Sequence, residues 1–205
     1  MSKSFDLKNF NSEQEQIVLG TLLGDGHLRK FPSTLFSTKG CDRSRDYVFW
    51  KYEELKSSGL FRHPPKSSPR RTRTGTTQSW SFYSRRNSIF NEYRQMFYPN
   101  GKKIVTREIL DRLDSLGLAV WYMDDGSRSK AKKHVRLATQ SFGQEGFEVI
   151  SEWFWERYRL HSFPDIRHNS SRMGWALRFR VEDSKRFLDI TRPHMVPCMS
   201  RKWGI

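Results

Sequence analysis

Two segments of the chain, VLGTLLGDG (residues 18–26) and LAVWYMDDG (residues 118–126), decide the fold. Each is an apolar run that ends in an acidic residue and a glycine, which predicts a helix that stops at the glycine. An aspartate is unfavourable at the C-terminal end of a helix, because the helix dipole is negative there. One such Asp-Gly pair is an ordinary turn, but two copies 100 residues apart indicate a functional pair.

Asp25 and Asp125, the acids of the two segments, are expected to meet at the tips of two packed helices. Gly20 and Gly24 lie four residues apart on one helix face, so a second helix can approach the first closely. Two nearby carboxylates repel each other unless a cation lies between them. Their oxygens suit Mg²⁺, which keeps bound waters and shares phosphate oxygens. The pair therefore predicts a site for Mg²⁺, or another divalent cation, that supports hydrolysis of a phosphodiester.

The charge of the chain points to a polyanionic partner. The 205 residues include 37 Lys and Arg against 22 Asp and Glu, which gives a net charge of +15. Three segments contain bases but no acids: Leu55–Asn91, Gly126–Gln144 and Ile166–Val181. Aromatic and β-branched residues are interleaved with these bases, so the segments are not simple disordered tails. A chain whose charge only keeps it soluble is the weaker alternative.

Other classes of protein are disfavoured by the same sequence. No apolar run approaches the roughly 20 residues of a membrane span, and the N-terminal residues show no secretory signal. The two cysteines, Cys41 and Cys198, belong to no CxxC pair, which disfavours a zinc ribbon or a disulfide scaffold and favours a reducing compartment.

The remaining pattern predicts an α+β chain of two similar halves, residues 1–104 and 105–205. In the first half, a capping box at Ser12–Glu15 opens a helix that runs to Gly24, two more helices are expected at Arg45–Lys56 and Ser88–Phe97, and strands are expected at Leu28–Thr38, Arg70–Arg73 and Gln78–Ser84. In the second half, helices are expected at Leu116–Asp125, Gly146–Leu160 and Glu182–Thr191, and strands at His134–Phe142, Asp165–His168 and Gly174–Val181. The first strand of each half, Leu28–Thr38 with its interruption at Pro32 and His134–Phe142, is interpreted as a partly merged pair of strands. The order then predicts two αββαββα halves.

Alternation along the strands predicts one apolar and one polar face for each sheet. The apolar faces carry Trp80, Phe82, Val135, Leu137, Trp175, Leu177, Phe179 and Val181. The candidate DNA-contacting residues, on or beside the polar faces, are Arg70, Arg71, Arg73, Ser79, Ser81, Tyr83, Arg128, Arg136, Arg178 and Arg180. Side chains of these types bind phosphates and base edges, although an ordinary solvated sheet face is the alternative.

The two opening segments resemble the two motifs of LAGLIDADG homing endonucleases of the single-chain, double-motif kind. The segments TQSF (139–142) and PCMSRKW (197–203) are also similar to this family, and the resemblance covers nearly the whole chain. It implies that the motif helices form a pseudo-twofold interface and that the two antiparallel sheets form a saddle over the DNA major groove.

The resemblance also implies roles for individual residues. The acid before the last motif glycine binds the metal in the family, which selects Asp25 and Asp125. Asp124 departs from the family pattern, in which that position is usually small. A basic residue near each scissile phosphate is expected at Lys103 and Lys202, which lie 78 and 77 residues after the aspartate of their own half. Each could activate water or stabilise charge on the transferring phosphate.

Two further positions complete the expected site. Lys102 is the alternative to Lys103, because both follow the last helix of the first half in the loop YPNGKK. Gln140 is expected to approach the cleavage centre. The resemblance therefore implies a catalytic group of two aspartates, two lysines and one glutamine.

The function that follows is a site-specific, Mg²⁺-dependent endonuclease that acts as a monomer on a long asymmetric site in double-stranded DNA. The resemblance implies short 3′ overhangs and intron or intein mobility, and the small size of the chain favours a free-standing, intron-encoded form. Two alternatives are an intron RNA maturase or DNA-binding regulator with the same fold, and a basic scaffold that binds nucleic acid without specificity. Bacterial cytoplasm, mitochondrion and chloroplast are all compatible with the sequence.

Overall fold

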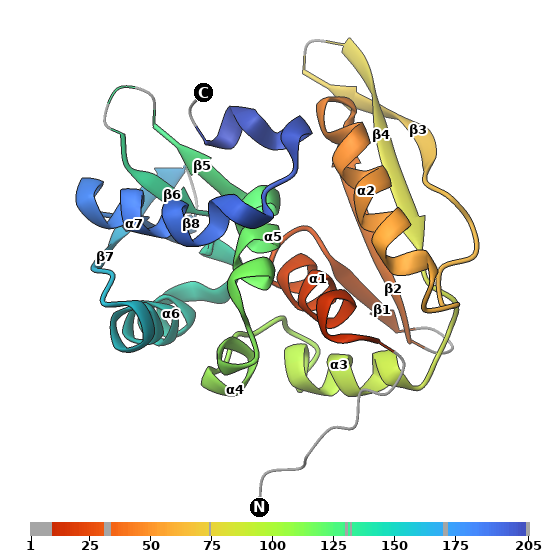
Figure 1. The fold of residues 1–205 in the computed structure, drawn as a ribbon, viewed down its shortest axis with the longest axis horizontal. Coiled ribbons are helices and arrows are strands. Elements are labelled where there is room, and N and C mark those ends of the chain that lie inside the picture. Colours follow the sequence, from red (N-terminus) through yellow and green to blue (C-terminus); the bar gives the residue numbers. More distant parts are fainter. Residues whose placement is uncertain are drawn as a thin grey trace, which may run out of the picture.

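A computed structural model describes residues 10–30, 34–73, 75–129, 131, 133–169 and 172–203. Its first half contains α1 (Ser12–Leu23), β1 (His27–Lys30), β2 (Thr34–Cys41), α2 (Arg45–Lys56), β3 (Lys66–Thr72), β4 (Gly75–Tyr83) and α3 (Ile89–Phe97). The second half contains α5 (Ser115–Asp125), β5 (Gly126–Arg128), β6 (Val135–Leu137), α6 (Gly143–Tyr158), β7 (Ser162–Asn169), β8 (Arg172–Phe179) and α7 (Val181–Thr191). The short helix α4 (Arg107–Asp111) connects the halves. Both halves thus have the predicted αββαββα order (Figure 1).

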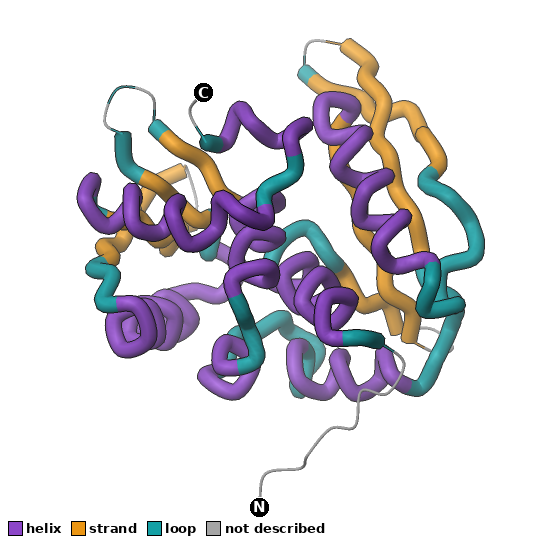
Figure 2. The backbone as a smooth tube through the Cα atoms, viewed as in Figure 1, coloured by secondary structure: helices purple, strands orange, loops and turns teal. Residues whose placement is uncertain are grey.

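Each half contains one four-stranded antiparallel sheet. The strand order is β1-β2-β4-β3 in the first sheet and β5-β6-β8-β7 in the second. The second order is the first with every number raised by four, so the halves are related by pseudo-symmetry. Figure 2 shows the strands of one half on each side of the molecule, with the two motif helices between them. Within the described part of the chain, no helix is long and apolar enough to cross a membrane.

The motif helices α1 and α5 pack closely because glycine lies at the crossing point. A Cβ atom added to Gly20 would lie 2.4 Å from the backbone oxygen of Gly117 and 2.8 Å from the Cβ of Val120. Polar contacts fix the other end of the pair, since the Gln16 side chain donates to the Arg112 carbonyl at 2.8 Å. The close approach expected from the glycine spacing is therefore present at Gly20.

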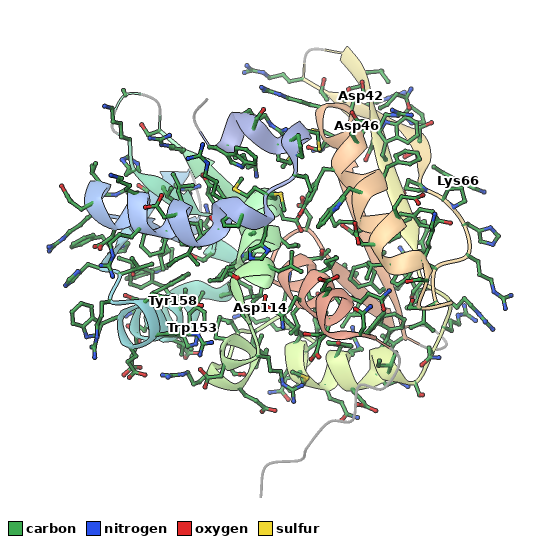
Figure 3. All side chains as sticks on the ribbon, in the orientation of Figure 1. Asp42, Asp46, Lys66, Asp114, Trp153 and Tyr158 are labelled. Atoms are coloured by element: carbon green, nitrogen blue, oxygen red, sulfur yellow. The ribbon has the colours of Figure 1, made fainter. Side chains whose placement is uncertain are left out.

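Helices cover one face of each sheet and bury its apolar side chains. In the first sheet Phe36 and Phe82 are buried, and Phe36 stacks on Phe90 of α3. In the second sheet Phe179 contacts Phe154 of α6, with 4.9 Å between ring centroids. Figure 3 labels Trp153, which α6 contributes to the same helix layer. The opposite face of each sheet is left open, as the alternation predicted.

Two predictions for the start of the chain need correction. The capping box lies one residue earlier than Ser12–Glu15: the Asn11 side chain accepts from the Gln14 backbone and the Gln14 side chain accepts from the Asn11 backbone. The segment Leu28–Thr38, expected as a merged strand with an interruption at Pro32, contains parts of two antiparallel strands, β1 and β2, that pair with each other.

Two predictions for the second half also need correction. The strand expected at His134–Phe142 ends at Leu137, because Thr139 turns the chain and donates its hydroxyl to the Trp175 carbonyl at 2.9 Å. Gln140 therefore lies in a 3₁₀ turn, not in a strand. Val181 is exposed and begins α7, so it does not belong to the apolar sheet face.

Candidate active site

The two motif aspartates lie at the tips of the paired helices. Asp125 is the last residue of α5, and Asp25 directly follows Gly24, the C-terminal cap of α1. Burial raises the pKa of Asp25 to about 6, and the negative charge of Asp124 adds to this shift. Burial also raises the pKa of Asp125 to about 7, and the charges of Asp25 and Asp124 contribute. The structure therefore brings the predicted pair close enough for the charge of Asp25 to oppose ionisation of Asp125.

Lys103 lies against the tip of α1. Its Nζ donates to the carbonyl of Gly24 at 3.1 Å and to that of Gly26 at 3.4 Å. Burial lowers the pKa of Lys103, although the neighbouring aspartates act in the opposite direction. Lys102 is exposed, so Lys103 is the lysine of this loop that lies beside the motif.

Lys202 occupies the matching place at the tip of α5. Its Nζ donates to the carbonyls of Tyr122 at 3.3 Å, Met123 and Asp124 at 2.9 Å. Burial lowers the pKa of Lys202 to about 8. A cation at the C-terminal end of a helix offsets the negative charge of the free carbonyls, which helps to hold an acid there. The structural equivalence of Lys103 and Lys202 expected from their spacing is thus visible in their contacts.

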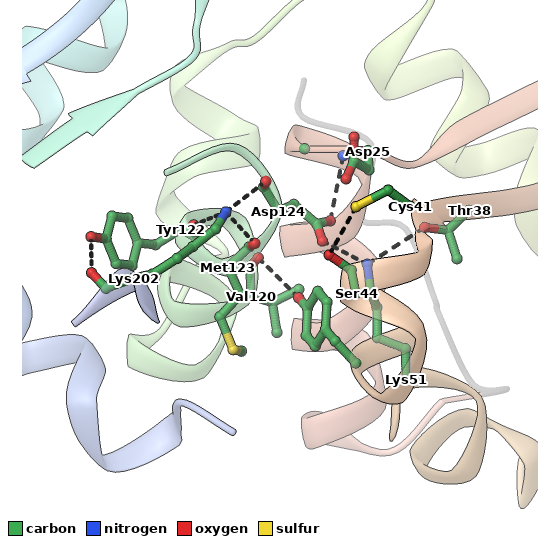
Figure 4. Close-up of polar contacts among 12 residues, drawn as sticks. Asp25, Thr38, Cys41, Ser44, Lys51, Val120, Tyr122, Met123, Asp124 and Lys202 are labelled. Atoms are coloured by element: carbon green, nitrogen blue, oxygen red, sulfur yellow. Dashed lines mark hydrogen bonds and ion pairs between the residues drawn. The ribbon is translucent and has the colours of Figure 1, made fainter. Parts of the chain in front are cut away.

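The Asp124 side chain reaches from the tip of α5 into the first half, towards Asp25 and Lys51 (Figure 4). Its Oδ1 accepts from Lys51 Nζ at 2.7 Å, and the two side chains are 1% and 2% exposed. Its Oδ2 accepts from the backbone N–H of Asp25 at 3.4 Å. A Cβ added to Gly24 would lie 2.4 Å from the Cβ of Asp124, so the larger residue packs where the first motif has a glycine.

The sequence interpretation missed Lys51. Its signal is present in the sequence, since Lys51 follows Tyr47 by four residues and precedes Leu55 by four, which places a lysine on the apolar face of an amphipathic helix. Lys39 was also missed. It lines the cleft next to Asp25 and pairs in register with Ser81, so it lies on the open face of the first sheet.

A cleft of about 530 Å³ runs over the open face of the first sheet and ends at Asp25. Its lining includes the predicted residues Arg70, Ser79, Ser81 and Tyr83. Arg71 and Arg73 do not line this cleft. Arg71 is the next residue along β3, so its side chain points to the opposite face, and Arg73 lies beyond the end of the strand.

The open face of the second sheet carries two neighbouring arginines, Arg136 and Arg178, which are directly paired across β6 and β8. Arg136 Nε donates to Asp165 at 2.7 Å, and this ion pair holds the guanidinium on the sheet. The guanidinium groups of Arg178 and Arg180 lie over the ring of Phe163, at 5.9 and 5.1 Å.

Arg128 does not share this face. It pairs in register with Val135, which is fully buried, so both side chains lie on the helix-covered face. The Arg128 guanidinium donates to the carbonyl of Trp203 and lines a pocket beside α7. The structure thus separates Arg128 from the other arginines with which the sequence interpretation grouped it.

Gln140 is exposed and follows the segment that docks on the second motif. The backbone N–H of Ala138 donates to the carbonyl of Asp125 at 3.0 Å, two residues before Gln140. This contact holds the start of the turn against the motif.

The donor set fits a hard divalent cation. Among the residues that the structure describes, no group of three or more His, Cys, Asp or Glu side chains gathers around one point. Two neighbouring carboxylates are nevertheless enough protein ligands for Mg²⁺. This ion binds through one or two carboxylates and takes its remaining ligands from water and phosphate oxygens. Asp25 and Asp125 are the residues that would hold it.

Comparisons with known proteins agree with this geometry. A model of the LAGLIDADG DNA endonuclease family matches residues 15–187. The protein RecA of Mycolicibacterium fallax is 29% identical over 94% of this chain, which spans 46% of the length of that protein. The cytochrome b mRNA maturase bI2 of Debaryomyces hansenii is 28% identical over 98% of this chain and 79% of the maturase.

Solved structures show the same fold. The homing endonuclease I-WcaI bound to its DNA recognition sequence matches with a TM-score of 0.81 at 21% identity, over 98% of this chain and 94% of that one. The structure of I-DmoI in complex with DNA and Mn matches with a TM-score of 0.54 at 13% identity, over 88% of this chain and 96% of that one. The family match covers most of the sequence and includes both motifs. The chain therefore belongs to the LAGLIDADG DNA endonuclease family.

Proposed function

We propose that the chain is a site-specific endonuclease that hydrolyses both strands of a long, asymmetric DNA site with a divalent cation. The observation that carries this proposal is the pair of motif aspartates, which lie at equivalent helix tips with one half-buried lysine beside each tip. Each tip adjoins an open, basic sheet face. The two halves differ in the side chains on these faces, which favours an asymmetric site read by one copy of the chain.

The residues of the site divide the chemistry between them. A divalent cation supplies Lewis-acid stabilisation of charge on the phosphate when it is bound. Asp25 and Asp125 would hold that cation, and ionised carboxylates are otherwise unfavourable at the two tips. Lys202 donates to three carbonyls, which requires the ammonium form, so it places a fixed positive charge beside the site. Lys103 lies at the corresponding place in the first half, where it donates to two carbonyls.

The sheets supply binding and alignment. Arg70, Ser79 and Ser81 line the cleft that leads to Asp25, and Arg178 lies on the corresponding face of the second sheet. Guanidinium groups bind phosphates and guanine edges, and hydroxyl groups bind phosphates or the edges of several bases. A duplex that lies along both faces would have its two backbones above the aspartates. The I-WcaI and I-DmoI structures that share the fold are bound to DNA.

A cleavage selection tests the proposal. The protein is incubated with a randomised duplex library and Mg²⁺, the cut ends are captured and sequenced, and the Asp25→Asn, Asp125→Asn double variant is the control. One long asymmetric motif, cut by the wild type alone, is the expected result. Tight, salt-sensitive binding without any cut DNA would refute nuclease activity.

A second candidate function is that of an intron RNA maturase. It is favoured by the similarity to the cytochrome b mRNA maturase, which extends over 98% of this chain. Splicing of candidate group I introns, compared with and without the double variant, separates the two functions. If the variant speeds splicing while cutting no DNA, the maturase activity does not depend on the cleavage site.

The intron-encoded, free-standing form and the role in intron mobility are also proposals. The chain spans about half the length of the RecA relative, so relatives of this sequence also occur within longer proteins. Cleavage of an intronless allele but not of the intron-containing allele would support intron mobility, because the insertion interrupts the site.

A further inference from the structure

The two motifs differ at one position that lies inside the contact between the halves. The first motif has Gly24 before its aspartate and the second has Asp124. The two residues pack against each other at the tips of the helices, as the 2.4 Å approach of a Cβ added to Gly24 shows. The carboxylate of Asp124 therefore reaches into the first half, whereas Gly24 sends no side chain back.

Two groups of the first half hold this carboxylate, and two more surround its lysine partner. Lys51 of α2 contacts one oxygen at 2.7 Å, and its Nζ also lies 3.5 Å from the Thr38 hydroxyl and 4.5 Å from the centre of the Tyr47 ring. The other oxygen accepts from the backbone N–H of Asp25. Figure 4 shows Asp124 between Lys51 and Asp25. One buried carboxylate thus links α5 to α2 and to the residue that follows α1.

Stability alone does not account for this pair. Burying two charges costs free energy that their mutual attraction does not reliably recover, and apolar replacements of both partners are often neutral or stabilising. The geometry gives the pair another consequence. Lys51 fixes the direction of the Asp124 carboxylate, and the carboxylate fixes the backbone at Asp25. In a cleavage site, a displacement of about 1 Å can slow the reaction by roughly 100-fold.

We infer that Asp124 is a positioning residue: its side-chain oxygen aligns Asp25, and one half of the cleavage site depends on that acceptor. This inference rests on the proposed endonuclease function. The other half has no such support, because Gly24 cannot offer an acceptor to Asp125. The two DNA strands are therefore cut by centres with different requirements.

Two double variants separate positioning from burial of charge. Lys51→Met, Asp124→Ala removes both charges and the acceptor for the Asp25 N–H. Lys51→Met, Asp124→Asn removes both charges but keeps an oxygen acceptor. Neither leaves an unpaired buried charge, so both are expected to fold. The control is Lys56→Met, Glu53→Ala, which removes an exposed ion pair from the same helix.

The primary measurement follows each strand of the selected site with a separate end label. We expect the Asp124→Ala double variant to cut one strand at least about tenfold more slowly, so that nicked DNA accumulates, while the other strand is cut at the wild-type rate. The Asp124→Asn double variant is expected to stay within about threefold of the wild type on both strands. Equal slowing of the two strands, or equal rates in the two variants, would overturn the inference.

Calorimetric titration of the DNA complexes with Ca²⁺ gives a readout independent of cleavage. We expect an unchanged number of sites in all variants and weaker binding in the Asp124→Ala variant than in the Asp124→Asn variant. Loss of one Ca²⁺ site in both double variants would show that Asp124 is a metal ligand and would overturn the positioning role. If the wild type cuts no DNA, the proposed function fails. The same Ca²⁺ titration, with a DNA site selected by binding, would still test whether Asp124 aligns Asp25.

Discussion

At the scale of single residues, the site combines groups that each disfavour the folded state. Asp125 ends a helix, lies near two other carboxylates and has a pKa raised to about 7 by burial. Lys202 is half-buried, and desolvation lowers its pKa to about 8. Without a bound cation, the charged forms of these groups lower the stability of the folded state. A loss of stability at a functional site is common in natural proteins.

The first prediction is that Asp125→Asn stabilises the metal-free protein near pH 8. The folded carboxyl keeps its proton to about pH 7, whereas the ordinary value is 3.8, so the folded state binds more protons between these values and stability falls as pH rises. Discounted for partial exposure, removal of the charge should add about 1–2 kcal/mol, or roughly 2–6 °C in Tm.

Thermal unfolding in a chelator checks this prediction. The gain should shrink as the pH is lowered towards 4, because the wild-type carboxyl is then protonated in the folded state. Asp189→Asn, at an exposed position on α7, is the control and should leave Tm unchanged at both pH values. A Tm gain that is the same at every pH would argue against charge as the cause.

The second prediction concerns the lysine beside each tip. Lys202→Met should reduce the cleavage rate by about 10²–10³-fold, since it removes a preorganised charge next to the phosphate. Affinity for the DNA site, measured with Ca²⁺, should change little because many other contacts remain. The control is Lys102→Met, which removes an exposed lysine next to Lys103. This variant should cleave DNA at the wild-type rate. Parallel loss of binding would instead assign Lys202 to the DNA contact.

At the scale of elements, the sequence defined the helices better than the strands. The amphipathic pattern of Arg45–Lys56 predicted α2 with its observed bounds. The pattern of Leu28–Thr38 merged β1 and β2, which pair with each other, although Pro32 interrupted it. The contact between Lys51 and Asp124 joins residues 73 positions apart and two different halves, so no local pattern could reveal it. The alternation of side chains did identify the open sheet faces.

The third prediction uses the register of β3. Arg70 lies in the cleft and pairs with Thr77, whereas Arg71 points to the other face of the same strand. Arg70→Ala should weaken DNA binding and lower the slope of log K against log salt by about 0.9 if it contacts one phosphate. Arg71→Ala removes the same charge one residue away and should leave the slope unchanged. Equal effects of the two variants would show that the strand face does not matter.

At the scale of the whole molecule, the two halves form one site because the motif helices approach so closely. Gly20 makes this contact possible, since a Cβ there would lie 2.4 Å from the Gly117 oxygen. The family resemblance of the sequence predicted this pairing, and the family match and the shared fold confirm it. The Mg²⁺ site and the long, asymmetric form of the DNA target stay predictions.

The fourth prediction is that Gly20→Ala separates the halves. The added methyl has no flexible side chain to displace, so we expect a loss of about 1–3 kcal/mol from overpacking. Urea unfolding would measure it. Glu13→Ala, on the exposed part of the same helix, is the control and should stay within about 0.5 kcal/mol of the wild type. If the Gly20 variant is as stable as the control, the helix contact is looser than the structure indicates.

The buried pair between Lys51 and Asp124 also governs how this chain can recombine with its relatives. Each half supplies only one of the two charges, so neither half can form a symmetric dimer with itself without burying two like charges or losing their partner. A chimera that joins the first half to a foreign second half with glycine at the position of Asp124 would leave Lys51 buried and unpaired, a loss of about 3–5 kcal/mol. Exchange of one half of this chain for that of a relative is therefore expected to keep the fold stable only when the incoming half supplies the matching member of the pair, or when the remaining member is replaced as well.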